Sequence, residues 1–65
     1  MPFVEVKGVR GVFSRDEKKR IIEDVTGVFA QIKSDEFATG VWVVVNELDE
    51  GSWGEGGTVI CTDNV

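Results

Sequence analysis

Five consecutive apolar residues at positions 41–45, Val-Trp-Val-Val-Val, restrict the folds open to this chain more than any other feature. β-Branched and aromatic side chains favour extended backbone, so the run predicts a strand. A strand without polar alternation is typical of a sheet that is covered on both faces. The rest of the chain therefore has to supply or recruit cover for two faces of a sheet.

A second strand is predicted at residues 2–9, where the side chains alternate between the two faces of the backbone. Two valines would share one face and three other residues the opposite one: Val4 and Val6 against Phe3, Glu5 and Lys7. We expect this strand to pair with the run at 41–45.

An amphipathic helix is predicted between the strands, over residues 15–33. Ser14 and Glu17 have the spacing of a capping box, in which each side chain bonds to the backbone N–H of the other residue. Apolar residues then recur every three or four positions: Ile21, Val25, Val28 or Phe29, and Ile32, with Ile22 beside them. The charged residues of the helix are expected in solvent: Lys18, Lys19, Arg20, Glu23 and Asp24.

The order strand, helix, strand predicts a β-α-β unit with parallel strands and a right-handed crossover. Its single helix covers one face of the sheet, so the other face has to meet another subunit.

Glycine-rich segments predict the connections. Residues 8–11, Gly-Val-Arg-Gly, are expected to form a turn or bulge, and residues 34–40 a loop. Four glycines in residues 51–57 predict a tight hairpin that presents Trp53 and Glu55. A short strand at 58–61 and a tail complete a single domain that spans residues 1–65.

The small size of the chain calls for additional stabilisation, because 65 residues bury only about 60% of their unfolded surface. Cys61 is the only cysteine, which excludes an internal disulfide. Without histidine, the chain has too few ligands for a structural zinc site, and we expect neither metal nor cofactor. Oligomerisation remains as the expected source of stability.

The net charge of −5 argues against nucleic acid as a partner. Every basic residue lies at or before Lys33, and residues 34–65 carry seven acidic residues. An anion-binding arginine must therefore be sought in the first half, chiefly Arg10, Arg15 or Arg20. The acidic half either faces the basic half of another subunit or forms a solvated rim. No segment resembles a signal peptide or a membrane span of roughly 18 apolar residues, so we expect a cytoplasmic protein without membrane contact.

Pro2 is the only proline and follows the initiator methionine. Removal of Met1, which is usual before a small residue, leaves a secondary amine at the start of the chain. This nitrogen is a base that needs no side chain, in a sequence without histidine. The alternative is that proline only opens the strand, where no ladder hydrogen bond is lost.

These features together resemble the tautomerase superfamily, typified by 4-oxalocrotonate tautomerase. The resemblance covers nearly the whole chain. It rests on the penultimate proline, the helix start at 14–18 (Ser-Arg-Asp-Glu-Lys), the valine-rich second strand, and Glu47 followed by the hairpin Gly51-Ser52-Trp53-Gly54-Glu55-Gly56-Gly57. It implies an α+β fold of the tautomerase/MIF-like type, a parallel β-α-β unit with a C-terminal β-hairpin. Dimers of such units are expected to assemble into a homohexamer, a trimer of dimers.

The resemblance also implies an enzyme in which Pro2 is the general base. A free α-amino group titrates at about 8, and an apolar pocket near cationic groups lowers that pKa. The neutral amine takes a proton α or γ to a carbonyl and returns it at another carbon. The implied reaction is enol–keto or double-bond isomerisation of a small unsaturated 2-oxo acid. Trp53 matches an aromatic residue that walls the family's pocket, or else it packs at a subunit interface.

The arginines depart from the family pattern, which has one just before the helix start and one at the head of the second strand to hold substrate carboxylates. The first position falls on Val12 or Phe13, and the second on Trp42. Arg10 is the favoured substitute for the first arginine, with Arg15 as the alternative. Trp42 either offers its indole N–H to the substrate or belongs to the core.

Glu55 suggests a second reaction. In the related trans-3-chloroacrylic acid dehalogenase, a glutamate at this hairpin position activates water for addition to an unsaturated acid, and the protonated proline is the acid. Glu55 falls on that position, or it is a solvated carboxylate at the hairpin tip. The alternatives to a tautomerase are thus a hydratase or dehalogenase that uses Glu55 and Pro2, or a non-catalytic assembly subunit that forms a heteromer with another chain.

Overall fold

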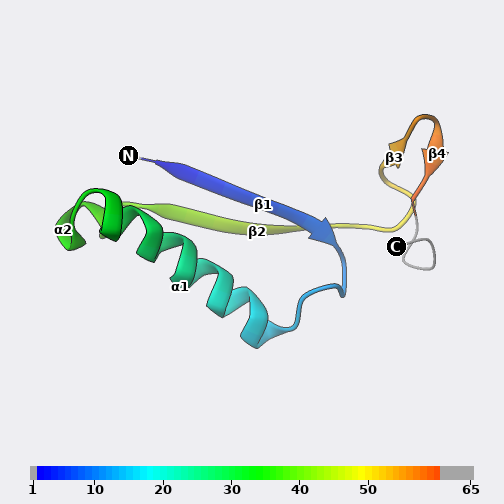
Figure 1. Cartoon of the computed structure of the whole chain (residues 1–65). Coiled ribbons are helices and arrows are strands. Elements are labelled where there is room, and N and C mark those ends of the chain that lie inside the picture. Colours follow the sequence, from blue (N-terminus) through cyan, green and yellow to red (C-terminus); the bar gives the residue numbers. More distant parts are fainter. Residues whose placement is uncertain (1, 61–65) are drawn as a thin grey trace.

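The computed structural model describes residues 2–60 and contains two small sheets and two helices (Figure 1). In chain order, the elements are β1 (Phe3–Val9), α1 (Arg15–Ile32), α2 (Asp35–Ala38), β2 (Trp42–Leu48), β3 (Gly54–Glu55) and β4 (Thr58–Val59). β1 pairs with β2, and β3 pairs with β4. The predicted β-α-β unit with a C-terminal hairpin is confirmed.

The β1–β2 sheet is parallel, with Phe3 opposite Trp42 and each later residue of β1 opposite the next residue of β2. Backbone hydrogen bonds extend the ladder at both ends. The Trp42 N–H donates to the Pro2 carbonyl over 3.1 Å, and the Arg10 N–H donates to the Leu48 carbonyl over 2.8 Å. β2 therefore continues three residues past the predicted run at 41–45.

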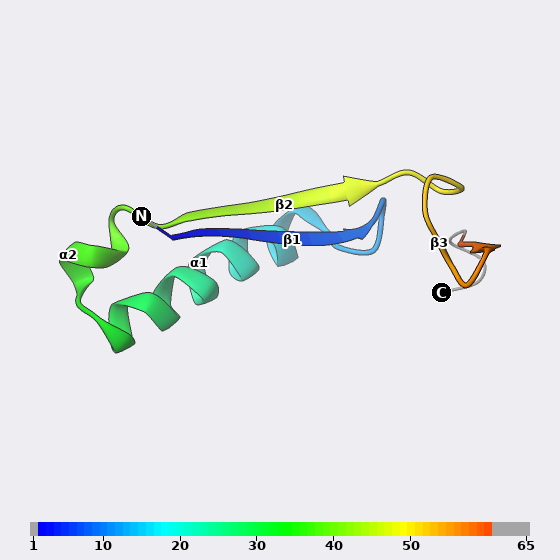
Figure 2. The ribbon, with the colours of Figure 1, turned by 90° about the horizontal axis from the view of Figure 1, so that it is seen from above.

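α1 lies along one face of this sheet, and no other element of residues 2–60 lies across the opposite face (Figures 1 and 2). Strand alternation and the register place four half-buried valines on the α1 side: Val4, Val6, Val43 and Val45. The alternation predicted for residues 2–9 is confirmed, because Phe3, Glu5 and Lys7 are exposed on the other side.

The capping box at the start of α1 is formed as predicted. The Glu17 N–H donates to Ser14 Oγ over 3.1 Å, and the Ser14 N–H donates to Glu17 Oε1 over 2.7 Å. Asp16 and Glu17 also place negative charge in the first turn, where the helix dipole favours it. Local sequence thus determines where the helix begins.

Two predicted connections are wrong in detail. Residues 34–40 were expected to be a loop, but Ser34 caps the short helix α2 through its Oγ, which accepts the Phe37 N–H over 3.0 Å. The turn expected at residues 8–11 begins only after Val9, because β1 continues through Gly8. A Cβ at Gly8 would lie 3.0 Å from Phe13 Cε2. Glycine at this position therefore leaves room for the Phe13 ring and does not form the turn.

The predicted glycine hairpin is confirmed as β3 and β4, with Gly54 opposite Val59. Gly56 and Gly57 have φ of 59° and 87°, which suits a two-residue hairpin turn that needs positive φ at both positions. A Cβ on Gly54 would lie 2.6 Å from the Thr58 carbonyl oxygen. The strand predicted at 58–61 ends at Val59, while Cys61 and the predicted tail lie outside the described residues.

Little of the described chain is buried. Val9, with 5% of its surface exposed, is the one buried apolar residue within residues 2–60. Large apolar side chains remain exposed on the strands, α1, α2, the β1–α1 turn and the hairpin: Phe3, Val12, Ile22, Val28, Ile32, Phe37, Trp42, Trp53 and Val59. No helix in this part of the chain is both long enough and apolar enough to cross a membrane.

Candidate active site

Pro2 and Trp42 lie together at the amino end of the sheet. Pro2 is half-buried, and its carbonyl accepts the hydrogen bond from the Trp42 N–H. The Trp42 side chain is 58% exposed and leans against the Phe3 ring, with 6.2 Å between the ring centroids. Trp42 is therefore a surface residue of this chain rather than part of its core.

A pocket with a volume of about 350 Å³ lies at the opposite, carboxyl end of the strands. Its lining comes from the end of β1, the turn that follows, the end of β2 and the segment before β3: Lys7, Gly8, Val9, Val12, Phe13, Leu48 and Trp53. Trp53 thus lines a pocket, while its predicted role as the wall of the substrate site stays a prediction. Lys7 is a cationic lining residue that the sequence reasoning missed.

The two ends are separated by the length of β1. Seven strand residues at about 3.3 Å each span roughly 20 Å, and the two ends lie on opposite sides of Figure 1. Within the chain, Pro2 is therefore brought together with Trp42, but not with Arg10, Trp53 or Glu55.

Arg10 follows β1 and forms an ion pair with Asp49, which follows β2. Arg10 Nε donates to Asp49 Oδ1 over 2.7 Å, and both side chains are largely exposed. The hydrogen bond to Asp49 and its negative charge raise the pKa of Arg10. A substrate carboxylate that approached this edge of Arg10 would compete with a carboxylate already bound there.

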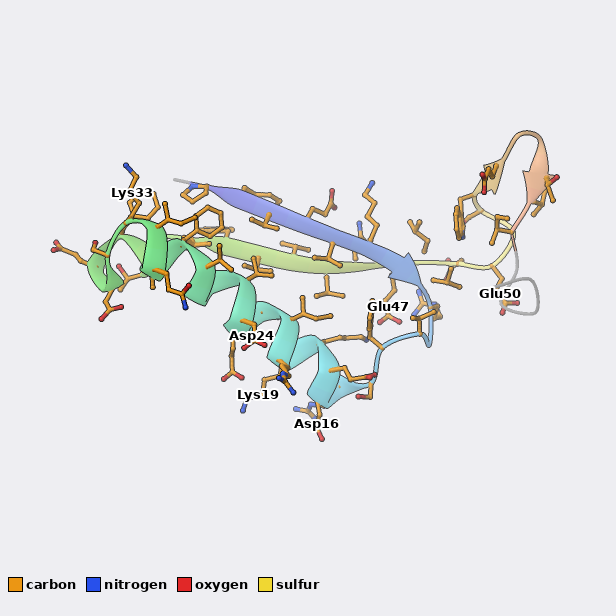
Figure 3. The ribbon with its side chains drawn as sticks, viewed as in Figure 1. Asp16, Lys19, Asp24, Lys33, Glu47 and Glu50 are labelled. Atoms are coloured by element: carbon orange, nitrogen blue, oxygen red, sulfur yellow. The ribbon has the colours of Figure 1, made fainter. Side chains whose placement is uncertain are left out.

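Glu47 links the turn after β1 to the start of α1 (Figure 3). Its carboxylate forms an ion pair with Lys18 and accepts the Gly11 N–H over 3.0 Å. These two hydrogen bonds lower the pKa of Glu47. Lys18 was predicted in solvent but is half-buried by this contact. The sequence motif included Glu47, but it gave no signal for the Lys18 contact.

Neither Glu55 nor Arg15 lines the pocket beside Trp53. Glu55 is exposed on β3, opposite Thr58. Arg15 begins α1 and lines a hollow of about 590 Å³ on the outside of that helix, together with Asp16, Lys18, Lys19, Ile22 and Glu23. This hollow is larger than the pocket beside Trp53, but its lining is mostly charged side chains of a single helix, so we assign no reaction to it. Within residues 2–60, no three acidic or cysteine side chains group closely enough to hold a metal ion.

A parallel β-α-β unit followed by an antiparallel hairpin has the architecture of the tautomerases, and solved tautomerase folds superpose on it. The family model of the tautomerase enzymes matches residues 2–62. The chain belongs to this family and is an isomerase-type enzyme. The comparison with curated protein sequences gives no match.

Solved structures similar to this chain include small proteins of nearly the same length. DmpI from Helicobacter pylori is 25% identical, with a TM-score of 0.73 over 89% of this chain and 94% of that chain. YwhB, a homologue of 4-oxalocrotonate tautomerase, is 21% identical, with a TM-score of 0.76 over 89% and 92% of the two chains. Another 4-oxalocrotonate tautomerase homologue is 18% identical, with a TM-score of 0.76 over 91% and 90%.

Proposed function

We propose that this chain is a tautomerase whose general base is the Pro2 amine, exposed when Met1 is removed. The observation that carries the proposal is that the tautomerase family match begins at Pro2, the residue that leads into β1. The substrate is a small unsaturated 2-oxo acid, isomerised between enol and keto forms or by migration of a double bond.

The reaction needs only that one group takes a proton from the substrate and returns it at another position. The neutral amine of Pro2 takes the O–H proton of an enol, or a C–H proton α or γ to the substrate carbonyl, which leaves an enolate or dienolate and a protonated proline. The protonated amine then returns the proton at another position, so the amine is regenerated and the product is an isomer of the substrate. No oxidant and no water enter the balance.

The active site of this proposal is shared between subunits. Pro2 and the pocket beside Trp53 are separated by the length of β1, so one protomer does not hold both. A two-fold axis that pairs two β1 strands antiparallel would bring Pro2 of one subunit to the pocket end of the other. The unpaired edge of β1 and the exposed rings of Phe3 and Trp42 support such a contact. Three dimers would complete a homohexamer, and a heteromer with a second chain of this fold is the alternative.

The proposal is tested with phenylenolpyruvate, whose ketonisation is followed by loss of its ultraviolet absorbance. We expect turnover by protein whose first residue is Pro2, verified by mass. Pro2→Ala should lose most of the activity, and a variant with one extra residue before Pro2 should lose it completely, because an amide nitrogen has no basic lone pair. Turnover that survives in the extended variant would refute the proposal.

A hydratase or dehalogenase is the second candidate, supported by the exposed carboxylate of Glu55 on the same hairpin that follows Trp53. Here Glu55 activates water and the protonated Pro2 is the acid. Product formed from an acetylenic or 3-halogenated acrylic acid, and lost in Glu55→Gln, would favour this reaction. If neither substrate class reacts with protein that begins at Pro2, a non-catalytic subunit that needs a second chain is favoured.

A further inference from the structure

We propose that Lys7 binds the substrate carboxylate and that the pocket beside it selects a monocarboxylate with an apolar body. This inference rests on the proposed function, because it names the substrate class and a binding residue for the same site. It replaces Arg10, which sequence reasoning favours for that role.

The lining of the pocket carries one charged side chain. Of its seven residues, Lys7 alone is charged, and the others are glycine, aliphatic or aromatic. The volume of about 350 Å³ lies at the lower end of the range, roughly 300–1,000 Å³, that is usual for small-molecule sites. The composition therefore suits a small ligand with one anionic group and an apolar remainder.

The strand register explains how Lys7 and the apolar walls come together. Lys7 and Val9 are two residues apart on β1 and share a face, and Leu48 lies directly opposite Val9 on β2. Trp53 closes the pocket from the segment that leads into β3. A carboxylate at Lys7 would thus leave the rest of the ligand against Val9 and Leu48, in reach of the Trp53 ring.

The ion pairs of the two cations distinguish Lys7 from Arg10. Arg10 Nε lies 2.7 Å from Asp49 Oδ1, a well-formed charge-assisted hydrogen bond. Lys7 Nζ lies 3.9 Å from Glu5 Oε1, beyond hydrogen-bond distance, and the other oxygen of Glu5 accepts from Asn46 Nδ2 over 3.2 Å. An incoming carboxylate therefore has to displace a weaker ion pair at Lys7 than at Arg10.

The same charges argue against a dicarboxylate. The second carboxylate would lie against apolar walls, where an unpaired charge is strongly disfavoured. Arg10, which follows β1, already forms an ion pair with Asp49. The pocket therefore discriminates by the number of carboxylates as well as by the shape of the ligand.

The test uses cinnamate, an unreactive aromatic monocarboxylate, and its neutral amide, with affinities measured by isothermal titration calorimetry on the assembled protein. We expect wild-type protein to bind cinnamate and to bind cinnamamide more weakly. Lys7→Gln should lower the affinity for cinnamate roughly tenfold to a hundredfold, which is the usual range for a lost hydrogen bond to a charged group. It should leave the affinity for cinnamamide unchanged. Lys7→Arg should restore most of the cinnamate affinity.

Lys19→Gln is the matched control. Lys19 is also an exposed lysine with a long ion pair, 3.8 Å from Glu23, but it lies on α1 away from the pocket. We expect the Lys19→Gln variant to bind cinnamate with the affinity of wild-type protein. We expect Arg10→Gln to reduce the cinnamate affinity less than Lys7→Gln does. Sedimentation velocity on each variant verifies that the assembly is unchanged.

The inference is overturned if cinnamate does not bind, if Lys7→Gln binds it as well as wild-type protein, or if Arg10→Gln loses more affinity. These failures are distinct from failure of the proposed function. If turnover requires the free Pro2 amine but Lys7→Gln leaves the cinnamate affinity unchanged, only the inference is rejected. Cinnamate binding that requires Lys7, in protein that begins at Pro2 and does not isomerise phenylenolpyruvate, rejects the proposed reaction and retains the binding site.

Discussion

Gly8→Ala is expected to destabilise the protein and to deform the pocket. The new Cβ would lie 3.0 Å from Cε2 and 3.5 Å from Cδ2 of the Phe13 ring, whereas comfortable carbon–carbon contacts are about 3.5–4.0 Å. The ring therefore has to move by roughly half an ångström. Phe13 lines the pocket beside Lys7, so the movement reaches the proposed ligand site.

The magnitude follows from two opposing effects. Overpacking costs typically about 1–3 kcal/mol, and replacing a strand glycine recovers about 0.5–1 kcal/mol of backbone entropy. The two ranges leave a net loss of about 0–2.5 kcal/mol, with a middle value of about 1 kcal/mol. Each kcal/mol lowers the melting temperature of a domain of this size by about 4–8 °C. Calorimetric melting of both proteins at the same concentration measures it, so that any self-association affects both measurements equally.

Gly27→Ala is the matched control for this substitution. Gly27 lies within α1, and apart from its chain neighbours and the adjacent helix backbone, no atom of residues 2–60 lies within 4 Å of the position that its Cβ would take. Alanine should therefore stabilise the helix by up to about 1 kcal/mol. A Gly8→Ala protein that is more stable than wild type and binds cinnamate with unchanged affinity would show that the Phe13 ring does not pack against Gly8. Destabilisation by Gly27→Ala would instead indicate that a neighbouring subunit packs on this glycine.

Three further substitutions examine the fold and its assembly. Ser14→Ala removes the Oγ that accepts the Glu17 N–H and should cost about 1 kcal/mol of unfolding free energy in urea titrations, more than Ser34→Ala at the four-residue helix α2. The hydrogen bonds of Glu47 lower its pKa from the ordinary 4.5, so the Glu47 carboxylate stabilises the fold above pH 4.5 and this stability is lost as the pH falls through the folded-state pKa. Glu47→Gln should flatten this part of the pH–stability curve, and an unaltered curve counts against the contact. Trp42→Lys places a charge on the exposed sheet face and should yield smaller species in sedimentation velocity, whereas Gln31→Lys on the exposed side of α1 should not. Equal assembly of both variants argues against a subunit contact at Trp42.

Local signals account for what the sequence predicted well. The capping box needs only Ser14 and Glu17, and the hairpin needs only the paired glycines 56 and 57, so neither depends on distant parts of the chain. Alternation along residues 2–9 likewise specifies which side chains share a face. These elements together were enough to predict the parallel β-α-β unit.

Features that depend on the register were missed. Lys7 and Trp53 line one pocket only because the carboxyl ends of β1 and β2 lie side by side, and Lys18 meets Glu47 because α1 packs against β2. Gly8 was misinterpreted because the sequence does not distinguish a glycine that turns the chain from one that admits a neighbouring ring. The helix α2 was missed because four residues are too few to display helical periodicity.

The role of the Pro2 nitrogen is tested most directly by relating activity to the mass of the N-terminus. Protein expressed with Met1 partly retained is treated with methionine aminopeptidase for increasing times, and intact mass gives the fraction of chains that begin at Pro2. We expect the rate of phenylenolpyruvate ketonisation to rise in proportion to that fraction and to vanish when it is zero. A rate that does not depend on the fraction would mean that the Pro2 amine is not the base.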